Sequence, residues 1–174
     1  MGAGPVQIRG DRLISQKIDF SKVSFLIVDD NKLSIKMVGD TLRYLGAVDV
    51  EITRDPEEAL ALMKRQRTDV LITEWKMERM SGVEFLDVIR NSAASPDRFI
   101  PVIMLTAHSE EPFVVGARDT GVTEFLAKPF TAKGFYSRLV SAIARPRNFI
   151  NAPSYFGPDR RRKSLPFDGD DRRT

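Results

Sequence analysis

Residues 23–31 read VSFLIVDDN, an apolar run of strand length that ends in two aspartates, Asp29 and Asp30. A short continuous apolar run is typical of a strand buried on both faces of a sheet. Four further apolar runs follow along the chain. We expect these five runs to be strands, at residues 23–28, 48–52, 70–73, 101–105 and 122–126.

The segments between these runs have apolar residues at spacings near three and four, which predicts helices. Pro56 follows Asp55 as a helix start, and Gly46 and Gly121 follow helix ends. Strict alternation of strands and helices implies parallel strands with right-handed crossovers. The predicted fold class is therefore α/β, a doubly wound five-stranded parallel sheet with helices at 32–45, 56–67, 82–91, 110–120 and 131–145.

The pattern divides the 174 residues into an arm at 1–22, a domain at 23–145 and a tail at 146–174. The arm has no clear periodicity, so it is either a flexible arm or a segment docked through Leu13, Ile14, Ile18 and Phe20. The tail holds four prolines, two glycines and clustered charge. Such a composition does not build its own core, and we expect an irregular tail that is disordered or loosely docked.

Composition limits the classes of protein. The absence of cysteine excludes disulfides, thiolate nucleophiles and zinc sites of the cysteine type, and fits a reducing compartment. No stretch approaches the roughly 18 apolar residues of a membrane span, and no signal-peptide core stands at the start. There is also no glycine-rich phosphate loop and no nucleophile with a paired base. We expect a cytoplasmic protein without a transmembrane segment that is not an enzyme.

The net charge of +3 is unevenly distributed. From Arg145 onward the chain holds eight Lys or Arg and four Asp or Glu, which leaves 19 basic and 20 acidic residues before that point. A basic tail on a near-neutral domain favours an anionic partner, and charge alone leaves open whether this is a nucleotide, a nucleic acid or a membrane.

Polar residues follow the predicted strands: Asp29 and Asp30 the first, Glu74 the third, Thr106 the fourth and Lys128 the fifth. The carboxyl ends of parallel strands share one rim, so these groups should converge there. Three crowded carboxylates repel one another unless a cation compensates them. The sequence therefore predicts an acidic pocket neutralised either by Mg²⁺, which prefers oxygen ligands, or by the lysine.

Several short motifs occur in a fixed order: Val28–Asn31, Glu74–Met77, Ser81-Gly82, Leu105–Ala107 and Lys128–Phe130. With these motifs in this order, the chain over residues 23–145 resembles the CheY-like response regulator receiver family. The resemblance implies a flavodoxin-like (βα)5 fold in which Asp29 and Asp30 hold Mg²⁺. It also implies a phosphoacceptor at position 74, a phosphoryl group held by Thr106 and Lys128, and a switch in which Phe125 moves with Thr106.

The sequence departs from the family at the phosphoacceptor, where Glu74 replaces aspartate, and at Glu78, where the family usually has proline. A glutamate carries its carboxylate one methylene further out, and misplacement by about 1 Å costs on the order of a hundredfold in rate. We expect phosphotransfer to be lost or severely impaired. Two readings remain open: Glu74 pairs with Lys128 and bonds to Thr106 as a mimic of the active state, or it is an inert site held by the same lysine.

The tail contains the unit Asp-Arg-Arg twice, at 159–161 and 171–173, with further basic residues at Arg162 and Lys163. Arginine stacks on a guanine or donates two hydrogen bonds to its O6 and N7, and aspartate accepts from its N–H groups. Tyr155 and Phe156 supply either a stacking surface or an anchor to the domain. The alternative for the whole segment is a solvated basic end.

A CheY-like domain followed by paired Asp-Arg-Arg clusters resembles the Cle class of CheY-like cyclic di-GMP effectors. The resemblance implies that the tail grips cyclic di-GMP and that the bound protein engages a flagellar motor switch or another motility protein. The residues concerned are Tyr155, Asp159, Arg160, Arg161, Arg162, Asp171, Arg172 and Arg173.

Two alternative functions remain. One is a regulator still controlled by a phosphorelay, and the other is a receiver-like scaffold whose tail binds nucleic acid or a membrane. Nucleic acid is disfavoured because interleaved aspartates weaken attraction to a polyanion.

Overall fold

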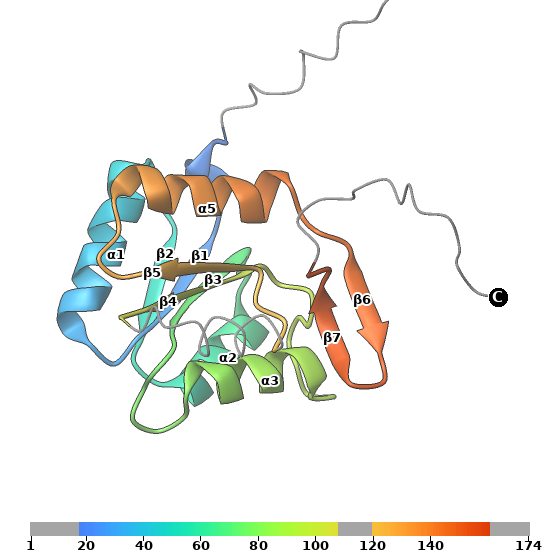
Figure 1. The fold of residues 1–174 in the computed structure, drawn as a ribbon. Helices are drawn as coiled ribbons and strands as arrows, with labels where there is room; N and C mark the ends of the chain where they lie inside the picture. The colour runs from blue at the N-terminus through green and yellow to red at the C-terminus, as the bar shows by residue number, and fades with distance from the viewer. Residues whose placement is uncertain (1–17, 108–119, 161–174) are drawn as a thin grey trace, which may run out of the picture.

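The computed structural model describes residues 18–107 and 120–160, which form a parallel sheet with helices on both faces and an added hairpin (Figure 1). In chain order the elements are η1 (Phe20–Lys22), β1 (Phe25–Val28), α1 (Lys32–Tyr44), β2 (Val50–Thr53), α2 (Pro56–Arg65), β3 (Val70–Glu74), α3 (Gly82–Asn91), β4 (Val102–Thr106), β5 (Glu124–Ala127), α5 (Ala132–Ala144), β6 (Phe149–Ala152) and β7 (Tyr155–Pro158).

The five strands pair in the order β2-β1-β3-β4-β5, all parallel. This confirms the predicted fold class, and each strand lies within two residues of its expected range. Four of the predicted helices are present as α1, α2, α3 and α5. The helix expected at 110–120 lies outside the described residues except for Thr120, which is in a turn.

Alternate strand residues face the two helical layers, and this gives the domain two cores. In β1, for example, Leu26 and Val28 pack towards α2 and α3, whereas Phe25 and Ile27 pack towards α1 and α5. Because both faces are covered, the strands are apolar almost throughout, and polar groups are concentrated at the strand ends.

The end of the predicted arm is docked. Phe20 is 3% exposed, and its ring lies 6.1 Å from that of Phe25 and 5.9 Å from that of Tyr136. Asp19 caps the short helix η1 by accepting from the Ser21 N–H. Ile18 also packs at the edge of this core, whereas Leu13 and Ile14 lie outside the described residues.

The first part of the tail differs from the expectation of an irregular segment. Residues 149–158 form an antiparallel hairpin, β6 and β7, which lies beside the end of α3 (Figure 1). Phe149 and Phe156 join Phe99 in an aromatic cluster with centroid distances of 5.1–5.5 Å. The hairpin thus packs its aromatic side chains against the domain, and composition alone did not indicate this contact.

A buried arginine lies beneath this hairpin. Arg90, on α3, is 0% exposed and donates hydrogen bonds to the carbonyls of Gly121, Arg98 and Ile100 at 2.8–3.0 Å. Its guanidinium carbon lies 5.2 Å from the ring centroid of Phe149. Burial lowers the pKa of Arg90 to about 10, so the group stays charged at neutral pH. The three carbonyls compensate for its lost hydration.

Two glycines set how closely the hairpin approaches the domain. Gly121 has a φ of +90°, and a Cβ on it would lie 2.7 Å from the Phe156 carbonyl oxygen. A Cβ on Gly157 would lie 2.6 Å from the Cα of Gly121. Arg147 closes the same junction by donating to the carbonyls of Val122 and Asp159.

We predict that Gly157→Ala destabilises the domain by about 1–3 kcal/mol, the usual cost of overpacking, and loosens the hairpin. Gly39→Ala is a matched control, because a Cβ there meets only the flexible end of Arg43 and alanine favours helix. Urea unfolding gives the free energies, and limited proteolysis after residue 145 reports the hairpin. Equal stability of the two variants would contradict the close contact with Gly121.

Candidate functional site

The polar residues expected at one rim do lie there. Asp29 follows β1, Glu74 ends β3, Thr106 ends β4 and Lys128 follows β5. Registers Val28↔Thr73 and Thr106↔Ala127 bring these strand ends level with one another.

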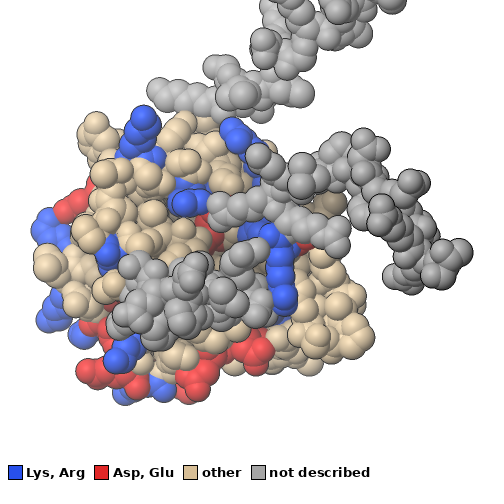
Figure 2. Space-filling view, in the orientation of Figure 1, with Lys and Arg blue, Asp and Glu red and all other residues tan. Residues whose placement is uncertain are grey.

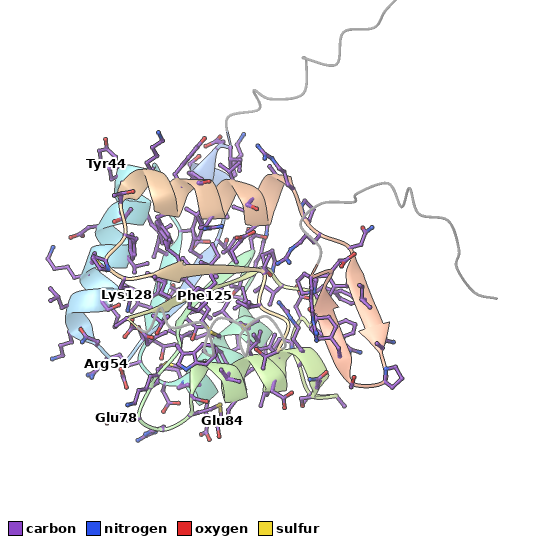
Figure 3. All side chains as sticks on the ribbon, in the orientation of Figure 1. Tyr44, Arg54, Glu78, Glu84, Phe125 and Lys128 are labelled. Carbon is purple, nitrogen blue, oxygen red and sulfur yellow. The ribbon has the colours of Figure 1, made fainter. Side chains whose placement is uncertain are left out.

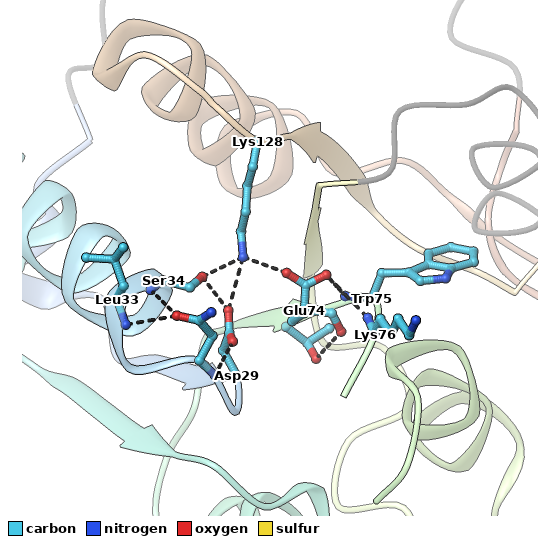
Figure 4. A network of polar contacts seen from close by, with 9 residues as sticks. Asp29, Leu33, Ser34, Glu74, Trp75, Lys76 and Lys128 are labelled. Atoms are coloured by element: carbon cyan, nitrogen blue, oxygen red, sulfur yellow. Dashed lines mark hydrogen bonds and ion pairs between the residues drawn. The ribbon is translucent and has the colours of Figure 1, made fainter. Parts of the chain in front are cut away.

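Lys128 lies at the centre of the site (Figure 4). Its ammonium donates to Glu74 Oε2 at 2.5 Å, Asp29 Oδ2 at 3.2 Å and Ser34 Oγ at 2.5 Å. The side chains of Lys128, Glu74 and Asp29 are only 15%, 12% and 3% exposed. One ammonium therefore pairs with two carboxylates whose side chains are largely buried, where removal of either partner is costly.

Glu74 is held on both carboxylate oxygens. While Oε2 faces Lys128, Oε1 accepts from the N–H groups of Trp75 at 2.6 Å and Lys76 at 3.3 Å. The pairing with Lys128 expected from the sequence is thus present. Thr106, expected as a second partner of Glu74, is fully buried at the end of β4.

Asp29 and Asp30 do not act as a pair. Asp29 accepts from the Asn31 N–H at 2.8 Å and from Ser34 Oγ, in addition to Lys128. Asp30 instead accepts on its Oδ2 from the Glu78 N–H at 2.8 Å, so it fixes the loop after β3.

Two contributors were missed in the sequence. Ser34 bonds to both Asp29 and Lys128, and Arg54 donates to the Asp30 carbonyl at 2.6 and 3.0 Å. Ser34 stands three residues after Asn31, which caps α1, and nothing in the helical periodicity indicated that its side chain points back at the site. Arg54 directly follows β2, and this position at the carboxyl rim was the only feature of the sequence that could have pointed to it.

An open pocket of about 380 Å³ lies beside this network. Its walls combine the charged groups with the apolar side chains Leu33, Met37 and Ala107. Leu33 is 76% exposed.

Phe125, the expected switch aromatic, is half-buried on β5. Its ring stands edge-on to that of Trp75, with centroids 6.4 Å apart and planes at 83°. Since the Trp75 N–H bonds to Glu74, a side-chain contact joins Phe125 to the segment that holds the glutamate.

A family model of the response regulator receiver domain matches residues 25–140. The chain belongs to the response regulator receiver family. The chain is 32% identical to the chemotaxis protein CheY-3 of Vibrio cholerae over 123 residues, which are 71% of this chain and 93% of that protein. Identity is also 32% to the chemotaxis protein CheY of Pseudomonas aeruginosa, over 71% of this chain and 98% of that one.

Solved structures agree with this assignment. The receiver superposes on the chemotaxis protein CheY4 of Vibrio cholerae with a TM-score of 0.62 and 32% identity, over 69% of this chain and 98% of that one. A putative response regulator from Chloroflexus aurantiacus gives a TM-score of 0.65 at 27% identity, over 71% of this chain and 98% of that one.

The receiver is thus a CheY-like signalling protein of a non-enzymatic family, as expected. Within residues 18–107 and 120–160, no helix has the length and apolar character needed to cross a membrane.

Receiver domains commonly bind Mg²⁺, but the carboxylates of Asp29 and Glu74 are not free to ligate the ion as they are arranged here. Asp29 and Glu74 have all four carboxylate oxygens hydrogen-bonded, and the Lys128 ammonium lies between them. Among the described residues there is no cluster of three or more acidic, histidine or cysteine side chains able to hold a metal. Of the two neutralising cations considered from the sequence, this arrangement favours the lysine.

The described part of the tail lies at the opposite rim of the sheet from this pocket. Arg90, Arg147 and Gly121 bind the hairpin at the amino ends of β4 and β5, whereas Lys128 follows the carboxyl end of β5. Figure 3 shows Lys128, Arg54 and Glu78 at the left-hand rim and the hairpin at the right.

The structure describes three of the expected nucleotide-binding residues: Tyr155, Asp159 and Arg160. The Arg160 guanidinium carbon lies 4.1 Å from the Tyr155 ring centroid, and Asp159 bonds through its backbone to Asn148 and Arg147. Phe156 is an anchor, 9% exposed. Arg161, Arg162, Asp171, Arg172 and Arg173 lie outside the described residues.

We predict that millimolar Mg²⁺ leaves the fluorescence of Trp75, the only tryptophan in the chain, unchanged relative to sodium chloride of equal ionic strength. Lys128→Ala should gain a Mg²⁺ response, because it frees Asp29 and Glu74 of their ammonium. Lys76→Ala, at the pocket wall, is the matched control. A saturable response of the unmodified chain would contradict the assignment of Lys128 as the internal cation.

Proposed function

We propose that this receiver is a signalling adaptor that responds to cyclic di-GMP through its arginine-rich tail and acts on a motility protein such as the flagellar motor switch. The observation that carries the proposal is Arg160, which stacks on Tyr155 at the end of a hairpin fixed to the domain. The arginine run therefore starts from a rigid platform.

The state of Glu74 supports an input other than phosphate. A phosphoacceptor needs a free carboxylate oxygen in line with the donor, and here Oε2 pairs with Lys128 while Oε1 accepts two backbone N–H groups. The added methylene shifts the carboxylate further from that line. The same ion pair supports a receiver held in one conformation, through the contact of Trp75 with Phe125. Thr106, Phe125 and Lys128 are the proposed switch residues.

The composition of the tail supports a guanine nucleotide as the ligand. Arginine forks match guanine O6 and N7 or phosphate oxygens, and the adjacent aspartates match the guanine N–H donors. The proposed ligand-binding residues are Tyr155, Asp159, Arg160, Arg161, Arg162, Asp171, Arg172 and Arg173.

The proposed partner follows from the relatives. The two curated relatives described above are both named chemotaxis proteins. This supports a protein of the motility apparatus as the target of this receiver as well.

We predict that calorimetry gives micromolar or tighter binding of cyclic di-GMP to the full chain, lost in a chain ending at Arg160. Truncation after Arg145 is unsuitable, because it removes the hairpin that covers Arg90. The affinity should fall with added salt, since the tail is cationic and the ligand carries two phosphates. Arg65→Ala, an exposed arginine on α2, is the matched control for loss of one charge.

Two outcomes would count against this function. No binding by the full chain would remove cyclic di-GMP as the input. Binding of random-sequence DNA or of anionic vesicles as tightly as cyclic di-GMP would favour a scaffold with a nonspecific basic tail.

We predict that a small acyl phosphate donor leaves no stable adduct on the unmodified chain. Glu74→Asp, which withdraws the carboxylate by one methylene, should gain a phosphate adduct, whereas Glu74→Gln should not. Intact-protein mass spectrometry reads all three. An adduct on Glu74 itself would restore the phosphorelay alternative.

A further inference from the structure

A polar groove of about 390 Å³, here called the hairpin groove, lies between the end of α3 and the hairpin. This volume is within the range of about 300–1,000 Å³ that small-molecule sites have. None of its lining residues is acidic: they are Asn91, Arg98, Asn151, Ala152, Pro153, Ser154, Tyr155 and Phe156.

Arg98 is held in place before any ligand arrives. Its guanidinium carbon lies 3.6 Å from the ring centroid of Phe156, and its Nε donates to the Arg90 carbonyl at 3.1 Å. Its two terminal nitrogens make no hydrogen bond to the rest of residues 18–107 and 120–160. A planar fork of donors, fixed by stacking, is therefore available at the groove wall.

The other walls favour a base over a phosphate. Asn151 and Ser154 supply side-chain groups that both donate and accept hydrogen bonds. Asn91 supplies a carbonyl acceptor, because its amide nitrogen donates to Asp87 at 2.7 Å. Asn91 is the last residue of α3, and the carboxyl end of a helix carries partial negative charge, which disfavours an anion. Guanine suits both features, because its O6 and N7 accept from an arginine fork while its N–H groups need acceptors.

The groove is also connected to the tail. Tyr155 lines it, and the ring of the same residue carries Arg160. Tyr155 and Phe156 are neighbours on a strand, so their rings point to opposite faces, and Arg98 and Arg160 stack on opposite sides of β7. In the view of Figure 2 acidic side chains gather along the lower edge of the domain, and the hairpin at the right shows none.

We propose that the hairpin groove binds one guanine base of cyclic di-GMP, with Arg98 as the residue that selects guanine. This rests on the proposed function. A cyclic dinucleotide has two identical guanylate halves, and the groove, with Arg98 stacked on Phe156, holds one of its two bases.

The test compares cyclic di-GMP with cyclic di-AMP on full chains by calorimetry. Adenine offers an N6 donor where guanine offers the O6 acceptor, so only guanine suits the fork. Arg98→Ala should weaken cyclic di-GMP binding about tenfold and reduce the preference over cyclic di-AMP. Arg98→Lys keeps the charge but not the fork, and it should lose the preference as well. Arg65→Ala should change neither.

The outcomes separate this inference from the proposed function. No binding of cyclic di-GMP by the unmodified chain defeats both. If the unmodified chain binds cyclic di-GMP and the Arg98→Ala and Arg65→Ala variants bind it with equal affinity, the proposed function stands and the assignment of the groove is wrong. Full selectivity in Arg98→Lys also overturns it, because charge alone would then suffice.

Asn151→Trp, an exposed change that fills the groove, should block binding while thermal unfolding stays as in the unmodified chain.

Discussion

A parallel sheet covered by helices on both faces is the constraint from which the rest of the structure follows. It requires apolar side chains along the central strands, and the two cores on either side of β1, β3 and β4 meet that requirement. Functional polar groups are then restricted to the two rims. The carboxyl rim carries the Lys128 network, and the amino rim carries Arg90 and the hairpin.

Both rims hold buried charged side chains, and the charge is compensated differently at each rim. At the carboxyl rim, excess negative charge from Asp29 and Glu74 is offset by one lysine inside the site. At the amino rim, a buried arginine without an ion-pair partner among the described residues is offset by three carbonyls and an aromatic ring. The first arrangement places a cation of the chain itself between the two carboxylates. The second fixes an appendage to the domain, because Phe149 of the hairpin covers the charge.

The fold was predictable because hydrophobic periodicity and strand-end residues are local signals. The strands, four of the helices and the convergence of Asp29, Glu74, Thr106 and Lys128 follow from them directly. The hairpin was not predictable, since its core lies in Phe99 and Arg90, far away in sequence. The different partners of Asp29 and Asp30 were also not predictable, because Asp30 accepts from the backbone N–H of Glu78 in a distant loop. Side-chain direction at a helix start, as at Ser34, is likewise set by tertiary contacts.

The contact between Gly121 and Gly157 has an evolutionary consequence. While the hairpin is docked, neither position can take a side chain, because a Cβ on either one meets the backbone of the opposite segment. The two codons are therefore under joint selection, although 36 residues separate them. A lineage that gave up the hairpin would be free to change Gly157, whereas Gly121 would still be restricted by its positive φ.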